Sequence, residues 1–158
     1  LCDSLGNDRF VANPDWGRID GDGFNNRANN FEQVDAYSSG GIDRAYLFDS
    51  SSNDRFIGNA DWARMDGDGF INRANHFSQV YAYASSGQDQ AYLYDSAHGD
   101  RFVADPEWGQ LDGIGFTNRA TGFDRIAAFA ELGGNDVIET TQEEAALDYI
   151  FDEYGDWD

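Results

Sequence analysis

The sequence predicts an all-β fold, a tandem-repeat β-solenoid of the parallel β-helix or β-roll kind. The first observation behind this is a period of 46 residues, since Asp8-Arg9-Phe10 returns at 54–56 and at 100–102. About 30 of the 46 positions are identical between the first two copies. A fixed period of this size is typical of solenoids, in which each unit buries its apolar face against its neighbours. The second observation is that apolar residues come in short clusters separated by Gly, Asp, Asn and Ser, as strands do.

The repeat register divides the chain into units 1–46, 47–92 and 93–138, followed by a distinct tail at 139–158. Leu1-Cys2-Asp3-Ser4 aligns with residues 47–50 and 93–96, so the chain begins within a repeat. We therefore expect it to be the C-terminal part of a longer array. Cys2 is the only cysteine and stands where Phe48 and Tyr94 stand, so we assign it no disulfide and no redox role.

Within a repeat, the apolar clusters alternate as strands with two different faces. In Ala45–Asp49, small or aliphatic residues occupy one face and aromatic residues the other. Half of the period, about 23 residues, suffices for three short strands and three turns. We therefore favour two coils per repeat. One large coil, or a pair of antiparallel hairpins per repeat, also fits the spacing.

The tail has a different pattern, which predicts a helix. Thr140 to Glu144 combine hydroxyl side chains with carboxylates, as helix N-termini do. Apolar residues then recur at helical spacing before Gly155: Leu147, Ile150, Phe151 and Tyr154. We expect an acidic helix that caps the last coil, because an uncapped β edge recruits other chains. A helix read by a partner for docking or sorting is the alternative.

Composition restricts the classes of partner. The net charge is −20, and the ten basic residues are all arginine. Nucleic acid is a poor partner, because phosphate contacts need basic patches, and insertion into a membrane is not expected, since no apolar run is long enough to span one. The absence of a Cys/His cluster removes zinc fingers and haem attachment. Cations, basic proteins and neutral sugars stay open.

The Gly- and Asp-rich turns are the strongest chemical signal. Ca²⁺ takes six to eight oxygen ligands from carboxylates, carbonyls and Asn side chains, and Gly lets a turn bend so that its carbonyls face inward. Three turn sets repeat with the period. The predicted calcium ligands are Asp20, Asp22, Asp66, Asp68 and Asp112 in the first set, Asp43, Asp89 and Asp136 in the second, and Asp49, Asp54, Asp95 and Asp100 in the third.

Stacked aspartates need a counter-charge. Two unit charges one strand spacing apart repel by about 3 kcal/mol at an effective dielectric constant of about 20. Calcium is the first candidate. The alternatives are the repeated arginines at positions 9, 55 and 101 and at 27, 73 and 119, or exposure to solvent, because Asp and Asn are also good turn residues.

The same turns resemble those of a known family. Gly-Gly-x-Asp and Asn-Asp-x-Phe turns look like degenerate RTX-type β-roll repeats, with Gly133–Ile138 as the nearest match. The pattern of residues 91–102 is similar to tandem repeats in secreted and surface proteins of aquatic bacteria. The resemblance implies calcium in the turns and an extracellular location. The period of 46 departs from the family's nonapeptide, so no fixed ligand set is carried over.

Two further patterns bear on function. The aromatic rows Trp16/Trp62/Trp108 and Tyr37/Tyr83/Phe129 are either core or, if exposed, surfaces for stacking on sugar rings. His76 and His98 occur once each, and no nucleophile or phosphate-loop motif is present, so we expect no enzyme. A polysaccharide lyase or hydrolase that uses paired carboxylates is the least favoured alternative.

Together these observations predict a calcium-stabilised, extracellular or cell-surface module with a structural or adhesive role, such as part of a fibre. Its expected partners are calcium and either a polysaccharide or other copies of itself. The alternative is a carbohydrate-binding module that uses the aromatic rows.

Overall fold

A computed structural model describes residues 1–141 and 151–157, and every regular element in these ranges is a β-strand. The strands are β1 (Arg9–Asn13), β2 (Trp16–Gly21), β3 (Phe24–Asn29), β4 (Gln33–Tyr37), β5 (Arg44–Phe48), β6 (Arg55–Gly58), β7 (Trp62–Gly67), β8 (Phe70–Asn75), β9 (Gln79–Tyr83), β10 (Gln90–Tyr94), β11 (Arg101–Asp105), β12 (Trp108–Gly113), β13 (Phe116–Thr121), β14 (Arg125–Ala130), β15 (Val137–Thr140) and β16 (Phe151–Gly155). The predicted all-β solenoid is confirmed.

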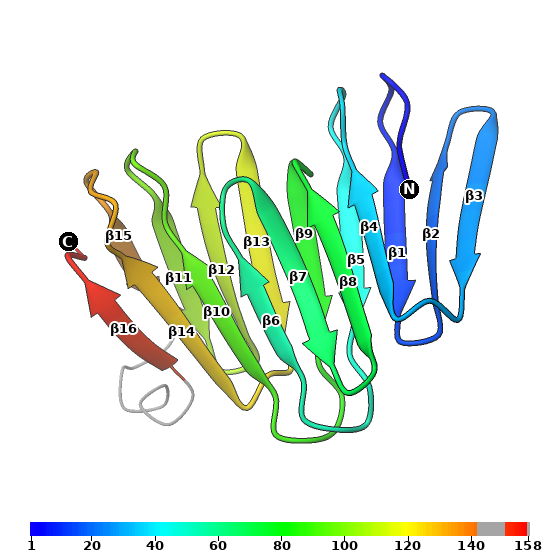
Figure 1. The fold of residues 1–158 in the computed structure, drawn as a ribbon. Coiled ribbons are helices and arrows are strands. Elements are labelled where there is room, and N and C mark those ends of the chain that lie inside the picture. Colours follow the sequence, from blue (N-terminus) through cyan, green and yellow to red (C-terminus); the bar gives the residue numbers. More distant parts are fainter. Residues whose placement is uncertain (142–150, 158) are drawn as a thin grey trace.

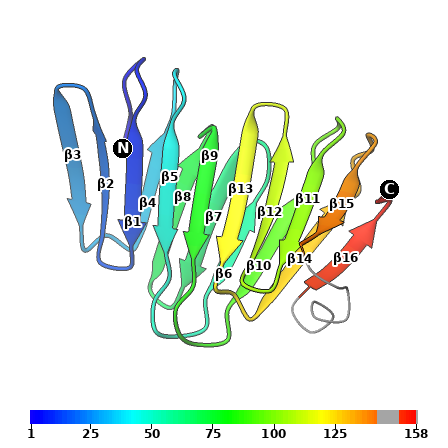
Figure 2. The same ribbon diagram turned by 180° about the vertical axis from the view of Figure 1, so that it is seen from behind.

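Two sheets face each other and form the body of the solenoid (Figures 1 and 2). The larger sheet has nine strands in the order β15-β11-β12-β13-β9-β5-β1-β2-β3. The smaller sheet has seven, in the order β16-β14-β10-β6-β7-β8-β4. The N-terminal β3 and the C-terminal β16 therefore lie at opposite ends of the molecule.

Each repeat combines an antiparallel meander with parallel stacking. β1, β2 and β3 form three antiparallel strands by tight connections, and the chain then crosses to the other sheet for β4 and back again for β5. These single strands pair in parallel with strands of the neighbouring repeats. The expected two coils per repeat are thus corrected to three passes, or one and a half turns. An odd number of passes places successive meanders in alternate sheets.

The core lies between the sheets and follows the predicted alternation. Ala45 and Leu47 of β5 are fully buried, whereas Tyr46 and Phe48 lie on the outer face. The largest buried side chains include one phenylalanine from each repeat, at positions 10, 56 and 102. Each of them belongs to the Asp-Arg-Phe motif, in which the Asp and the Phe are buried and the Arg between them is exposed.

The C-terminal end is closed by a strand. Residues Phe151–Gly155 form β16, which pairs in parallel with β14, so the prediction of a helix is wrong for Phe151, Tyr154 and Gly155. The remaining part of the predicted helix, 142–150, lies outside the described residues. Trp157 follows β16 and packs on Phe102, with 6.0 Å between the ring centroids. The described part of the tail thus joins the solenoid by strand pairing, which local spacing does not reveal.

No helix long and apolar enough to cross a membrane occurs among the described residues.

Candidate metal centre

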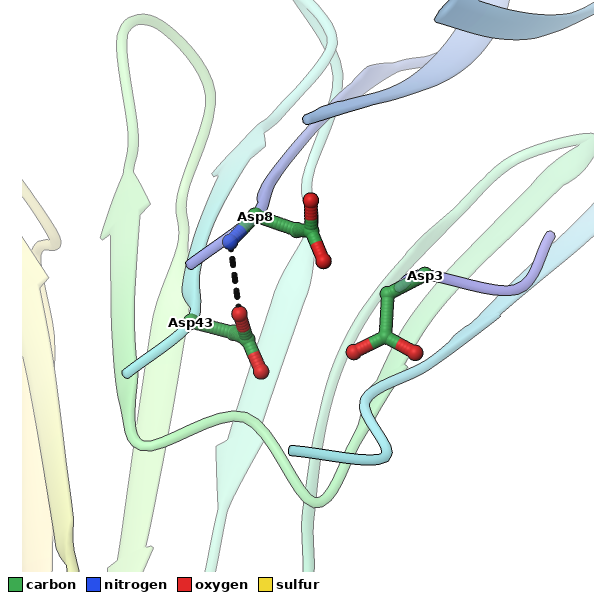
Figure 3. A group of neighbouring side chains, drawn as sticks. All are labelled: Asp3, Asp8 and Asp43. Carbon is green, nitrogen blue, oxygen red and sulfur yellow. Dashed lines mark hydrogen bonds between the residues drawn. The ribbon is translucent and has the colours of Figure 1, made fainter. Parts of the chain in front are cut away.

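Three aspartates from two passes of the chain meet beside the start of β1. The backbone N–H of Asp8 donates to Oδ1 of Asp43 over 2.6 Å, and Ser4 donates both its N–H and its hydroxyl to Oδ2 of Asp8, each over 2.8 Å. Asp3 accepts hydrogen bonds from the N–H and hydroxyl of Ser39. Figure 3 shows the three side chains together. We call Asp3, Asp8 and Asp43 the first acidic group.

The second repeat builds the same arrangement, which we call the second acidic group: Asp49, Asp54 and Asp89. The N–H of Asp54 donates to Oδ1 of Asp89 over 2.7 Å, and Asp49 accepts from Ser85. In each of the two groups, one carboxylate oxygen from each aspartate lies within 4.8 Å of the others. The first and the second repeat therefore each form one cluster of three carboxylates.

The third repeat keeps the hydrogen bonds without the same convergence. The N–H of Asp100 donates to Oδ1 of Asp136 over 2.8 Å, and Asp95 accepts from the N–H of Leu132. These three aspartates are not among the described groups that gather within 4.8 Å. One extra residue separates Asp100 from Asp136 compared with Asp54 from Asp89, so the third repeat departs from the spacing that forms the groups.

The acidic groups are buried and therefore electrostatically unfavourable when fully ionised. Asp43 and Asp89 are almost inaccessible to solvent, as are Asp8 and Asp54. Burial raises the pKa of Asp43, and the charges of Asp3 and Asp8 raise it further. Burial likewise raises the pKa of Asp89, with contributions from the charges of Asp49, Asp54 and Asp124. Both groups disfavour their own negative charge, which a cation would relieve.

One oxygen in each group lacks a hydrogen-bond partner. Oδ1 of Asp8 and Oδ1 of Asp54 are buried and accept no hydrogen bond, as is Oδ1 of Asp100 in the third repeat. A buried charged oxygen without a partner is costly and rare in folded proteins. The donor set is made only of hard oxygens, which suits Ca²⁺ or Mg²⁺ rather than softer metals. The residues present therefore fit a hard divalent cation.

The glycine of the Asp-Gly-Asp turn has a steric role in this arrangement. A Cβ on Gly21 would lie 1.5 Å from Oδ1 of Asp8, and one on Gly67 would lie 1.6 Å from Oδ1 of Asp54. The carboxylate of the acidic group thus rests directly against the glycine at the end of the second meander strand. Only glycine leaves the space that this carboxylate occupies.

The other residues predicted as ligands are placed differently. Asp20 pairs with Arg9 and Arg18, and Asp66 pairs with Arg55 and Arg64. Asp112 lies 3.9 Å from Arg101. Asp22 and Asp68 are exposed on the meander turns. The arginine alternative therefore describes Asp20, Asp66 and Asp112, and the exposure alternative describes Asp22 and Asp68. These five aspartates do not enter our proposal.

Two members of the first acidic group were absent from the predicted ligands. Asp3 and Asp8 are the counterparts of Asp49 and Asp54 one period earlier. The signal that could have found them is the repeat register itself, applied through the first residues of the chain.

The tryptophans lie on the outer faces of the sheets but do not form the predicted row, because Trp16 and Trp108 belong to the larger sheet and Trp62 to the smaller. Trp16 is only half-buried, and Arg27 covers its ring with the guanidinium carbon 4.5 Å from the centroid. The same pair recurs as Trp62 with Arg73 and Trp108 with Arg119. The interpretation of the tryptophans as core is therefore wrong. The second arginine set stacks on tryptophan and does not reach the acidic groups by any described hydrogen bond or ion pair.

Tyrosine and phenylalanine rings stack on one another on the outer faces of the sheets. Phe48 stacks on Tyr83 with 5.2 Å between centroids, and Phe129 stacks between Tyr94 and Tyr154 at 4.6 and 4.8 Å. The faces of these rings are therefore in contact with one another. Parallel strand pairing places Phe48 opposite Tyr83 and Tyr94 opposite Phe129, so the same pair of repeat positions stacks in each case.

Comparisons with protein-family models, curated proteins and solved structures found no match to this chain. The fold and the acidic groups define its class directly: a tandem-repeat β-solenoid with partly buried carboxylate clusters between passes that stack in the same sheet.

Proposed function

We propose that this protein is a calcium-stabilised extracellular repeat module with a structural or adhesive role. The observation that carries the proposal is the convergence of Asp49, Asp54 and Asp89, two of them buried, repeated from Asp3, Asp8 and Asp43. Each group contains a buried oxygen without a partner and an aspartate whose pKa is raised. A bound Ca²⁺ would supply positive charge to three carboxylates that otherwise repel one another.

An ion bound by ligands from two passes of the chain would hold those two passes together. Asp54 precedes β6, whereas Asp89 precedes β10, which pairs with β6 in parallel. An ion held by both therefore favours the stacked arrangement over any state in which the passes separate. Since the binding residues come together only in the folded chain, calcium stabilises the fold by mass action. Stiffness along the solenoid axis follows, as a spacer or fibre requires.

The extracellular location rests on the same chemistry. Extracellular calcium modules bind with dissociation constants of about 10⁻⁴ to 10⁻³ M, which suits an environment rich in the ion. Each acidic group uses serine side chains and backbone N–H groups to hold its carboxylates in place. Polysaccharide or other copies of the chain are the proposed structural partners, and no catalytic role is proposed.

Thermal unfolding in chelator and in millimolar Ca²⁺ tests the proposal, with Asp89→Asn and Asp66→Asn as matched variants. Asp89→Asn keeps an oxygen for the N–H of Asp54 and removes one buried charge. In chelator we expect it to raise the melting temperature by a few degrees, because like-charge repulsion falls. In calcium it should lose most of the ion-dependent gain. Asp66→Asn changes the same charge beside two arginines and should keep the full calcium response.

Equal melting temperatures of the unmodified chain in chelator and in calcium would contradict the proposal. A calcium response that Asp89→Asn leaves intact would show that the ion binds elsewhere. Isothermal calorimetry then gives the number of sites, for which we expect two from the two acidic groups.

The carbohydrate-binding alternative is not favoured. A sugar ring stacks on the face of an aromatic ring, but Arg27 covers Trp16 and the outer tyrosines stack on one another. The rows therefore present few uncovered ring faces to a ligand.

A further inference from the structure

The three repeats contain an equivalent edge strand that is covered in two cases and open in the third. β8 pairs in parallel with β4, and β13 pairs in the same register with β9. β3 pairs with β2 and ends the larger sheet, with no described strand on its other side (Figure 1). The comparison between these strands shows what an occupant of the open edge would contact.

Burial differs sharply between the equivalent phenylalanines beside this edge. Phe77 and Phe123 are 4% and 5% exposed, whereas Phe31 is 61% exposed. Phe77 packs on Phe10 of the preceding repeat with 6.0 Å between centroids, and Phe123 packs on Phe56 at 6.2 Å. Phe31 has the same sequence context without a preceding meander to cover it.

The polar groups follow the same pattern. Asn72 and Asn118 are buried, and each donates its side-chain N–H to a carbonyl of the preceding repeat, at Asn13 and Asn59 respectively, over 2.9 Å. Asn26, their counterpart, is exposed. The residue type needed for the contact is therefore present at the open edge.

Backbone groups at the covered edges define the hydrogen bonds to be filled. The N–H of Ile71 donates to the carbonyl of Glu32, and the N–H of Thr117 donates to that of Ser78. The carbonyl of Asn75 accepts from Ser38. By the repeat register, the N–H of Asn25 and the carbonyl of Asn29 are the corresponding groups on β3. An open row of this kind is a template for strand pairing.

An apolar hollow lies beside the open edge. It has a volume of about 190 Å³ and is lined by Leu1, Ala28, Phe31, Gln33, Val34 and Asp35. β3 itself contains no proline and no lysine, which commonly protect exposed edges. The surface thus combines free backbone groups with uncovered apolar side chains.

We propose that β3 and Phe31 form an acceptor surface for another unit of the same repeat. The unit would add its Gln-Val-x-Ala-Tyr strand, the sequence shared by β4 and β9, in parallel to β3. The established pairs set the register: Val34 stands opposite Asn72 and Ala36 opposite Ala74. The added Val therefore stands opposite Asn26, and the added Ala opposite Ala28. The Phe of the added unit's first meander strand covers Phe31.

Fusing a second copy of residues 47–92 directly before Leu1 tests the proposal, because Tyr92 precedes the residue equivalent to Leu1 in the existing array. Hydrogen exchange, measured in calcium, should show at least tenfold slower exchange of the Asn25 amide, approaching that of Ile71. The matched control carries Val80→Lys and Ala82→Lys in the added copy only, which places charges at positions that are buried in β9. This control should leave the exchange of Asn25 unchanged.

Unchanged exchange of Asn25 in the fusion with the unsubstituted copy would overturn the proposal, as would equal protection in the control. Protection in the unfused chain that rises with protein concentration would also overturn it, because the edge would then serve self-association between copies of β3. None of these outcomes depends on whether calcium occupies the acidic groups.

Discussion

The two ends of the solenoid solve the same packing problem differently. At the C-terminal end, β16 covers β14 and Trp157 packs on Phe102. Trp157 stands in the place that Phe77 takes on Phe10 and Phe123 takes on Phe56. At the N-terminal end, β3 is open and Phe31 is exposed. A non-repeated segment can therefore replace a missing repeat, and the exposed end shows which contacts one repeat supplies to the next.

The largest expected effect compares Phe77→Ala with Phe31→Ala. Phe77 is buried between repeats, so its truncation should lower the free energy of unfolding by about 3–5 kcal/mol. Phe31 is exposed, and its truncation should change the free energy by no more than about 0.5 kcal/mol. Denaturant unfolding of both variants measures the difference. Similar losses for the two would mean that Phe31 at the N-terminal end is covered in solution.

Trp157→Ala should give the next largest effect, because it uncovers Phe102 at the closed end. Trp157 is only half-buried, so we expect a loss of about 2 kcal/mol, less than for a core aromatic residue. Trp157→Phe keeps a ring against Phe102 and should recover most of the loss. Unfolding followed by circular dichroism measures both. A neutral Trp157→Ala would show that β16 closes the end without its neighbouring ring.

The buried aspartates and Glu139 at the closed end should respond to pH in chelator with opposite signs. Burial also raises the pKa of Asp100 in the third repeat, so the contribution of the aspartates is not confined to one end of the solenoid. The pKa of Asp43 and that of Asp89 are raised above the ordinary 3.8, so the folded state binds more protons than the unfolded state. Stability should rise as the pH falls from neutral through the raised folded-state pKa values toward 3.8, since the penalty of ionising these groups disappears. The pKa of Glu139 in β15 is lowered by Arg101, so its contribution has the opposite sign and is lost as the pH falls below its ordinary 4.5.

Melting curves over this pH range, with Asp43→Asn as the control, measure the first part. The variant should show a smaller rise in melting temperature on acidification. A melting temperature that falls steadily from neutral pH would contradict the assignment of the acidic groups as destabilising without a cation.

The smallest expected effect concerns one turn that occurs in each repeat. His76 and Asn30 have positive φ values of 60° and 57°, and Gly122 holds the equivalent position at 79°. His76→Gly should stabilise the fold by about 1 kcal/mol, because glycine adopts this conformation without steric cost. Asn30→Gly should gain less, since asparagine tolerates the left-handed region well. Thermal unfolding compares them, and a loss on His76→Gly would show that the exposed imidazole makes contacts that offset the strain.

The 46-residue period and the alternation of residue types predicted most of the fold. The separation of Ala45 and Leu47 from Tyr46 on two faces was predicted, because alternation depends only on the geometry of one strand. Which of the two faces is buried was not predicted. The antiparallel meander and the alternation of sheets were not predicted. Spacing alone does not distinguish a turn that returns the chain along the same sheet from one that carries it across to the other sheet. The prediction of a helix in the tail was wrong for a related reason, because the pairing of β16 with β14 depends on residues that are distant in the sequence.

The candidate site was predicted in part. Asp43, Asp49, Asp54 and Asp89 were among the predicted ligands, and the structure brings them into the acidic groups. Asp20 and Asp66 were predicted on the same chemical grounds, yet they face arginines across the strands. Residue type and turn chemistry do not tell the two environments apart, because the difference lies in which strands are neighbours.

The odd number of passes per repeat has a consequence for how an array would present itself. Because the meanders of the first and third repeats lie in one sheet and that of the second lies in the other, the structural identity period is two repeats. Neighbouring units are related by a half-rotation, so their meander turns, outer arginines and tryptophans are displayed on opposite sides. A flat ligand or surface that recognised the meander could touch only every second repeat. The valency of either side would then grow half as fast as the length of the chain.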